Sequence, residues 1–245
     1  MHPVPRKIAK VLLYPWYKLE SRVRPPSRWT SITCRALGVG DSQHDPRISL
    51  LVESLRQTAD VPGEVAECGV FQGISCIRLA LAIKEQGLAK TLYALDSFSG
   101  FDESADQEAA HLKDGVDNPV LLKGGFSETS VALLNRKIRE VRVESIVKLV
   151  PGYFCDSLPT LPERRYSFVH LDCDLAKSYR ECLEYFYPRL NQGGIIHLDE
   201  YDHAEWPLTK KVIDDFFGAR DEELVPVSRT LRGKRADRWY IRKAH

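Results

Sequence analysis

Two short acidic motifs follow two apolar runs in the second half of the sequence. The first motif contributes Asp172 and Asp174, and the second contributes Asp199 and Glu200. If the two runs are neighbouring strands of a parallel sheet, their carboxyl ends bring all four carboxylates to one edge. Such oxygen ligands favour a hard divalent cation such as Mg²⁺ or Mn²⁺, and without a cation the crowded groups repel one another. The residues therefore predict a metal site, with solvated capping of two turns as the alternative.

A glycine loop after an earlier apolar run is the second feature that could bind a ligand. Gly69 and Gly73 allow a sharp turn, and Ser75 falls in the first turn of a predicted helix, where free N–H groups suit an anion. Asp96 ends the next apolar run, where an acid commonly accepts hydrogen bonds from ribose hydroxyls. Together they predict an adenosine-type ligand, either a dinucleotide or S-adenosylmethionine. The spacing is not the dinucleotide fingerprint GxGxxG, so tight glycine packing and a turn role for Asp96 are the alternatives.

The elements that must position these residues alternate between apolar runs and amphipathic segments. Strands are predicted at 64–68, 92–95, 146–150, 167–171 and 194–198, and helices at 48–58, 75–85, 177–187 and 207–217. Nearly continuous apolar strands that alternate with helices are typical of a parallel sheet covered on both faces. Residues 223–230 and 237–243 predict an antiparallel hairpin around Gly233 that closes one edge. We expect a doubly wound, mostly parallel α/β domain.

Composition limits the class of protein. The chain has 245 residues, of which 43% are hydrophobic and 28% charged, the balance of a globular protein with a sizeable core. The 35 Lys and Arg nearly cancel the 34 Asp and Glu, so no global field indicates a nucleic-acid partner. The six cysteines form no CxxC pair, which favours reduced thiols in a cytoplasmic protein. No apolar stretch reaches the ~20 residues of a membrane span, and no signal-peptide pattern is expected.

Two segments differ from the rest of the chain. Residues 1–45 begin with a strongly basic stretch and are expected to form an arm or lid, with an amphipathic helix in weak contact with a membrane surface as the alternative. Residues 46–245 then form the main domain. Within it, the stretch 97–145 is too long for an ordinary connection and indicates a lid or a substrate-contacting insertion. Trp206, just beyond the second acidic motif, is expected either to line a substrate pocket or to pack in the core.

Six motifs, which occur in the same order as in the family, together resemble the macrocin O-methyltransferase (TylF) family. They are 67–73, 96–101, 152–159, 170–175, 187–194 and 199–201. The resemblance covers about residues 46–217 and implies a Rossmann-like class I methyltransferase fold with seven strands. It also implies S-adenosylmethionine as methyl donor, a divalent metal, a sugar or glycoside hydroxyl as acceptor, and a homo-oligomer.

The resemblance assigns donor-binding roles to residues in these motifs. Gly69, Gly73 and Ser75 would hold the methionine end of S-adenosylmethionine, and Asp96 its ribose. The remaining candidate cofactor-binding residues come from the same motifs and are Glu67, Phe71, Ser97 and Gly152.

The resemblance also assigns the metal and the proton transfer. Asp172, Asp199 and Glu200 match the metal positions, and Asp174 matches the expected general base, so Asp172 and Asp174 are the candidate catalytic residues. The metal would activate the acceptor hydroxyl, and Asp174 would take its proton. Glu200 stands where the family usually has Asp. Residues 176–179 read Ala-Lys-Ser-Tyr where Tyr-x-Ser-Thr is common, so the acceptor can differ.

Two other functions remain open from the sequence. Residues 172–174 also form a DxD motif, which in a glycosyltransferase holds a metal and a nucleotide-sugar diphosphate. That hypothesis leaves the glycine loop and the second acidic motif without a role. The other alternative is a non-catalytic member that binds the donor without turnover.

Overall fold

The computed structural model describes residues 18–24, 29, 33–34, 37, 44–111 and 123–244. Most of the predicted N-terminal arm, residues 1–45, lies outside these ranges. All six cysteines are free thiols, and only Cys155 is exposed. Among the described helices, none has both the length and the apolar character that crossing a membrane requires.

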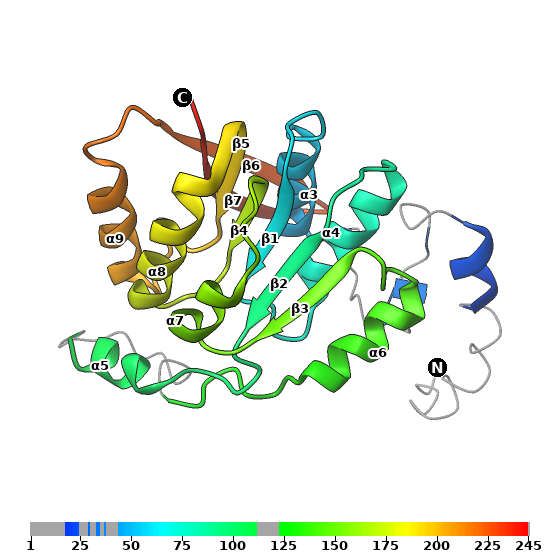
Figure 1. Ribbon diagram of the computed structural model, residues 1–245, viewed down its shortest axis with the longest axis horizontal. Coiled ribbons are helices and arrows are strands. Elements are labelled where there is room, and N and C mark those ends of the chain that lie inside the picture. Colours follow the sequence, from blue (N-terminus) through cyan, green and yellow to red (C-terminus); the bar gives the residue numbers. More distant parts are fainter. Residues whose placement is uncertain are drawn as a thin grey trace.

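The core of the protein is one seven-stranded sheet with the order β3-β2-β1-β4-β5-β7-β6 (Figure 1). The strands are β1 (Glu64–Cys68), β2 (Leu92–Asp96), β3 (Val147–Pro151), β4 (Tyr166–Leu171), β5 (Leu190–Leu198), β6 (Leu224–Leu231) and β7 (Lys234–Arg242). The first five run parallel, whereas β7 pairs antiparallel with both β5 and β6. This arrangement confirms the predicted doubly wound sheet and its antiparallel C-terminal hairpin.

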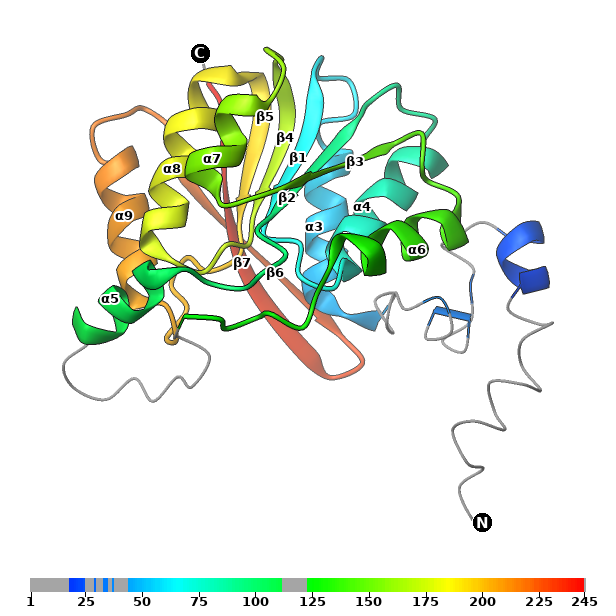
Figure 2. The ribbon, with the colours of Figure 1, turned by 60° about the horizontal axis from the view of Figure 1, so that its bottom comes forward.

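Helices cover both faces of the sheet, as Figure 2 shows. The helices are α3 (Pro46–Arg56), α4 (Ile74–Glu85), α5 (Glu103–His111), α6 (Val131–Val141), α7 (Phe154–Ser157), α8 (Ala176–Phe186) and α9 (Pro207–Phe217), with short 3-10 turns at Leu158–Thr160 and Tyr187–Arg189. One apolar core lies under α3, α4 and α6, and the other lies under α7, α8 and α9. Apolar residues on both sides of each central strand explain why these strands read as continuous apolar runs.

The insertion at 97–145 contributes two helices with different surroundings. Helix α6 packs on α4 and buries Leu134, Ile138 and Val141, so it belongs to the helical layer. Helix α5 lies on the side of the sheet where β2 and β3 end (Figure 1). Lys177 connects α8 to this region, because its ammonium forms an ion pair with Asp102 at 3.0 Å.

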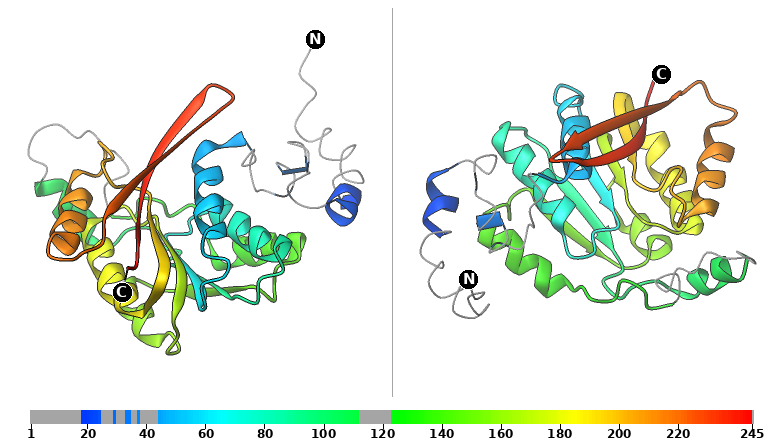
Figure 3. Two further views of the ribbon diagram at one scale, coloured as in Figure 1. Left: turned by 90° about the horizontal axis from the view of Figure 1, so that it is seen from above. Right: turned by 180° about the vertical axis from the view of Figure 1, so that it is seen from behind.

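Strand β5 is longer than the sequence predicted. It begins at Leu190 rather than at 194, because Leu190 already pairs with Tyr166 of β4 before the register shifts. Beyond β5, the hairpin of β6 and β7 extends past the other strands (Figure 3). Its outer part reaches α3, where Arg229 donates a hydrogen bond of 2.7 Å to Ser49.

Candidate active site

A cavity of about 440 Å³ lies at the carboxyl ends of the central strands. Its wall includes every predicted site residue except Glu67, namely Gly69, Phe71, Gly73, Ser75, Asp96, Ser97, Gly152, Asp172, Asp174, Asp199 and Glu200. The predicted ligand loop and the predicted acidic cluster therefore share one cavity, as the topology of a parallel sheet requires.

The two glycines of the loop are needed for packing as well as for turning. Gly69 has a φ of +86°, and a Cβ there would lie 1.6 Å from the carbonyl oxygen of Asp172. Gly73 has a φ of +81°, and its Cβ would lie 3.1 Å from Cγ of Leu134 on α6. No side chain fits at Gly69 without moving the backbone. The loop after β1 therefore contacts the backbone after β4 directly.

Asp96 holds this loop in shape. Its Oδ2 accepts hydrogen bonds from the backbone N–H groups of Val70 and Phe71, both at 2.8 Å, and its Oδ1 accepts one from Phe98 at 2.7 Å. Phe71 and Phe98 both have positive φ angles, which are uncommon for residues other than glycine. The carboxylate of Asp96 thus stabilises the turn, which was the alternative to ligand binding, and it also lines the cavity.

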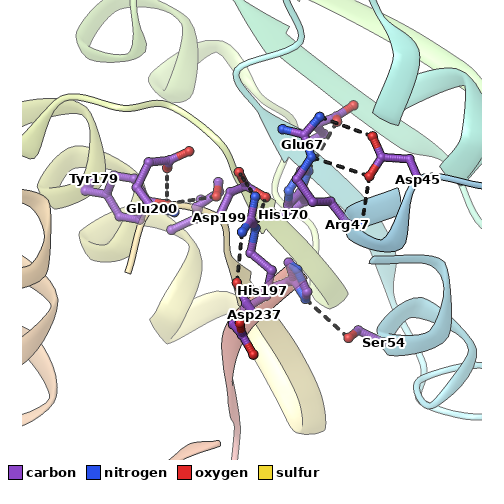
Figure 4. A network of polar contacts seen from close by, with 12 residues as sticks. Asp45, Arg47, Ser54, Glu67, His170, Tyr179, His197, Asp199, Glu200 and Asp237 are labelled. Carbon is purple, nitrogen blue, oxygen red and sulfur yellow. Dashed lines mark hydrogen bonds and ion pairs between the residues drawn. The ribbon is translucent and has the colours of Figure 1, made fainter. Parts of the chain in front are cut away.

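Glu67 lies behind the cavity wall in a buried polar row. It pairs in register with His170 of β4, which pairs with His197 of β5. Its Oε1 lies 3.2 Å from Nδ1 of His170, and Nδ1 of His197 lies 3.2 Å from the hydroxyl of Ser54 (Figure 4). Burial lowers the pKa of His170, but Glu67 and other acids outweigh this and raise it. Burial lowers the pKa of His197 to about 3.

Three carboxylates form a tight group on the cavity wall. Asp172, Asp174 and Glu200 each place one oxygen within 4.8 Å of the others. Burial, together with repulsion from neighbouring acids, raises the pKa of Asp172 to about 6 and those of Asp174 and Glu200 well above their ordinary values. The hydroxyl of the buried Tyr179 donates a hydrogen bond to Glu200. These donor atoms, all carboxylate oxygens, fit a hard divalent cation.

Asp199 has a different partner. Arg238 of β7 contacts both of its oxygens, with Nε at 2.6 Å from Oδ1 and Nη2 at 3.0 Å from Oδ2. Burial raises the pKa of Asp199, but the charge and hydrogen bonds of Arg238 outweigh this and lower it. Arg238 is a site residue that the sequence motifs do not predict. One signal was available, because Ala236, Arg238 and Tyr240 alternate on the buried face of β7.

Aromatic side chains form another part of the wall. Phe126 contacts Phe71 and Phe101 edge to face, each with ring centroids 5.3 Å apart. Phe101 also contacts Trp206 at 6.2 Å. Trp206 is buried and also lines the cavity. This wall joins the insertion at 97–145 to the segment before α9.

The strand order and the glycine loop at the end of β1 define the fold of class I methyltransferases. Solved structures that share it include the O-methyltransferase NovP and the calicheamicin methyltransferase CalS11, each with a TM-score of 0.67. NovP is 23% identical, and the alignment covers 98% of this chain and 97% of NovP. CalS11 is 21% identical, with 99% of this chain and 94% of CalS11 covered. The model of the macrocin O-methyltransferase (TylF) family matches residues 43–226, and the chain belongs to that family.

Three characterised proteins are similar in sequence. A tetracenomycin-C glycoside 4'-O-methyltransferase from Streptomyces olivaceus is 33% identical, and the alignment covers 58% of this chain and 54% of that protein. Mycinamicin III 3''-O-methyltransferase from Micromonospora griseorubida is 32% identical, and the alignment covers 58% of this chain and 56% of that protein. Demethyldecarbamoylnovobiocin O-methyltransferase from Streptomyces niveus is 29% identical, and the alignment covers 73% of this chain and 70% of that protein. The chain thus spans about half the length of the first two relatives.

Proposed function

We propose that this chain is an S-adenosylmethionine-dependent O-methyltransferase that requires Mg²⁺ or Mn²⁺ and acts on a hydroxyl of a sugar or glycoside. One observation carries the proposal: the glycine loop and the carboxylate group line the same cavity. A methyl donor and an activated hydroxyl would then meet in one space. The names of the relatives, which refer to glycosides and other natural products, support the acceptor class.

The donor would lie along the loop between β1 and α4. Gly69, Gly73 and Ser75 would hold its methionine end, because the first turn of α4 presents N–H groups there. Asp96 would accept a hydrogen bond from a ribose hydroxyl at Oδ1, where its three backbone contacts leave one lone pair free. Phe71, Ser97 and Gly152 would contact the rest of the donor, and Glu67 would support the wall from behind through His170.

The acidic cluster would hold the metal. Asp172 and Glu200 would bind it together with Asp199, which also contacts Arg238. When bound, the ion would act as a Lewis acid that lowers the pKa of the acceptor hydroxyl. Tyr179 would fix the orientation of Glu200, which is one methylene longer than Asp, through its hydrogen bond.

Asp174 would act as the general base. It lines the cavity beside Asp172 and Glu200, within reach of a hydroxyl bound there, as a general base must be. In the transfer, the acceptor oxygen forms a bond to the methyl carbon as the carbon–sulfur bond breaks, and the hydroxyl proton moves to the Asp174 carboxylate. S-adenosylhomocysteine and the methyl ether are the products. The aromatic wall of Phe101, Phe126 and Trp206 would exclude water and hold the acceptor.

Calorimetric titration tests the proposal. S-adenosylmethionine and a UDP-sugar are titrated separately, with and without Mg²⁺, into the wild-type protein, Asp172→Asn and Asp174→Asn. We expect all three proteins to bind S-adenosylmethionine, and both variants to lose methyl transfer to a glycoside panel. Metal-dependent binding of the UDP-sugar without binding of S-adenosylmethionine would overturn the proposal in favour of a glycosyltransferase. Donor binding without transfer to any acceptor would favour a non-catalytic member.

A further inference from the structure

The two acidic motifs contribute four carboxylates to the cavity wall, and one of them, Asp199, forms an ion pair with Arg238. Arg238 contacts both oxygens of Asp199, and its third nitrogen, Nη1, donates to the backbone oxygen of Asp237 at 2.8 Å. Only 8% of Arg238 is exposed. The guanidinium is therefore fixed at both ends in a place with little access to water.

The other three carboxylates differ from Asp199 in their surroundings. Asp172, Asp174 and Glu200 converge on one another, whereas both oxygens of Asp199 contact Arg238. A planar guanidinium that contacts both carboxylate oxygens occupies one lone pair on each of them, and its positive charge repels a metal ion that approaches the other lone pairs. Asp199 also lies outside the group of three whose oxygens converge within 4.8 Å.

We propose that Arg238 is a built-in counter-cation that competes with the divalent ion for Asp199. The inference rests on the proposed metal site. In the metal-free protein Arg238 neutralises Asp199 and stabilises the end of β5 against β7. When the ion is bound, Arg238 gives up at least one of its two hydrogen bonds to Asp199. Arg238 is thus a positioning residue that sets the affinity of the site for metal.

The competition has two measurable consequences. Removing the positive charge of Arg238 strengthens metal binding, because a like charge no longer opposes the ion and Asp199 is free to bind it. The same change destabilises the metal-free protein, because it leaves Asp199 without its counter-charge in a largely buried place. If Arg238 only oriented Asp199 for the metal, its removal would instead weaken metal binding.

Arg235 provides a matched control on the same strand. It forms an ion pair of 2.7 Å with Asp237, but both side chains are exposed. The variant Arg235→Gln changes the net charge by the same amount as Arg238→Gln, without touching the cavity. The variant Arg238→Lys keeps the charge but cannot contact both oxygens in the same planar geometry.

Mn²⁺ binding by electron paramagnetic resonance, without donor or acceptor, tests the inference. We expect Arg238→Gln to bind Mn²⁺ roughly tenfold more tightly than the wild type, and Arg235→Gln to bind it unchanged. In thermal scans without metal, Arg238→Gln should have a lower melting temperature than the wild type. Addition of Mn²⁺ should raise the melting temperature of the variant more than that of the wild type. If that variant does not fold, Arg238→Lys carries the test, with an expected gain of roughly threefold because one hydrogen bond is lost.

Unchanged or weaker Mn²⁺ binding by a folded Arg238 variant would overturn the inference while leaving the metal site intact. If the wild type does not bind Mn²⁺ but Arg238→Gln does, the competition is supported in its strongest form. If neither binds Mn²⁺, both the inference and the metal site are wrong. Binding of S-adenosylmethionine, measured separately, then shows whether the donor site remains valid.

Discussion

The carbonyl oxygen of Asp172 lies 1.6 Å from the point that a Cβ on Gly69 would occupy. The backbone after β1 and the backbone after β4 thus approach more closely than any side chain would allow. A hydrogen bond of 2.9 Å from the N–H of Asp172 to the oxygen of Cys68 fixes the approach. The proposed donor loop and the first acidic motif are therefore one rigid unit.

This contact predicts a large effect of a small substitution. Gly69→Ala should lower the free energy of unfolding by at least about 3 kcal/mol, because the backbone of Asp172 must move. Gly87→Ala is the control, since Gly87 also has a positive φ but nothing lies within 4 Å of its Cβ position. It should cost about 1 kcal/mol through backbone strain alone. Urea unfolding curves measure both, and equal losses would contradict the role of the contact.

Loss of the hydroxyl should affect the stability of the protein differently at two buried tyrosines. Tyr179 donates to Glu200, so Tyr179→Phe should cost about 1–3 kcal/mol and leave that carboxyl without its partner. The hydroxyl of Tyr166 is buried and has no hydrogen-bond partner among the residues that the structure describes, so Tyr166→Phe should be neutral or slightly stabilising. Both side chains are fully buried, so packing losses are matched. Thermal melting measures the difference, and a stable Tyr179→Phe would argue that Glu200 is held by other contacts.

The stability of the metal-free protein should depend on pH through Asp172. Burial and repulsion from Asp199 raise its pKa from 3.8 to about 6, so above pH 6 the native state holds a charge at a cost that the unfolded chain does not bear. Asp172→Asn should therefore raise the free energy of unfolding at pH 8 by about 1–3 kcal/mol. The gain should shrink as the pH falls from about 6 to about 4, because native Asp172 then binds a proton.

Denaturation in the presence of a chelator at several pH values checks this sign. Asp221→Asn is the control, because Asp221 is exposed and does not line the cavity. Its effect should be small and should not grow above pH 6. A destabilised Asp172→Asn at pH 8 would show that Asp172 makes favourable contacts that outweigh its repulsion.

Trp206 should affect the acceptor and not the donor. Trp206→Leu removes the ring that contacts Phe101, so we expect KM for the acceptor to rise roughly tenfold with little change in S-adenosylmethionine affinity. Trp239→Leu is the control, because Trp239 packs on Tyr201 and does not line the cavity. Steady-state kinetics and calorimetry separate the two effects. Equal losses of donor affinity in both variants would indicate a general structural role.

Local patterns were sufficient to predict most of the fold. The apolar runs that became β1 and β2 were predicted within one residue of their ends, because the buried residues of both strands are apolar except for Glu67. The first part of β5 was missed because Asn191, Gln192 and Gly193 look like a turn in sequence. Those residues span the register shift between Leu190, which pairs with Tyr166, and Ile195, which pairs with Phe168. The N–H of Gly193 donates a hydrogen bond of 2.8 Å to the oxygen of Lys243, just after β7.

The site was harder to predict where partners are distant in sequence. The sequence predicts that the carboxylates lie at strand ends, because each acidic motif directly follows an apolar run that forms a strand. It could not show that Arg238 reaches Asp199 or that Tyr179 reaches Glu200, because those pairs depend on how β7 and α8 pack. Nor could it show that Gly69 is required by contact with Asp172 rather than by a ligand alone.

Strand β7 comes after β6 in the sequence but lies between β5 and β6 in the sheet. During synthesis, a chain that has emerged from the ribosome only as far as residue 233 has already exposed Asp199, while Arg238 is still in the exit tunnel. At that stage β5 is an open sheet edge, which can pair with other chains. The electrostatics of the cavity are therefore completed only when the last strand inserts. A C-terminal fusion that delayed this insertion should promote aggregation of newly made chains.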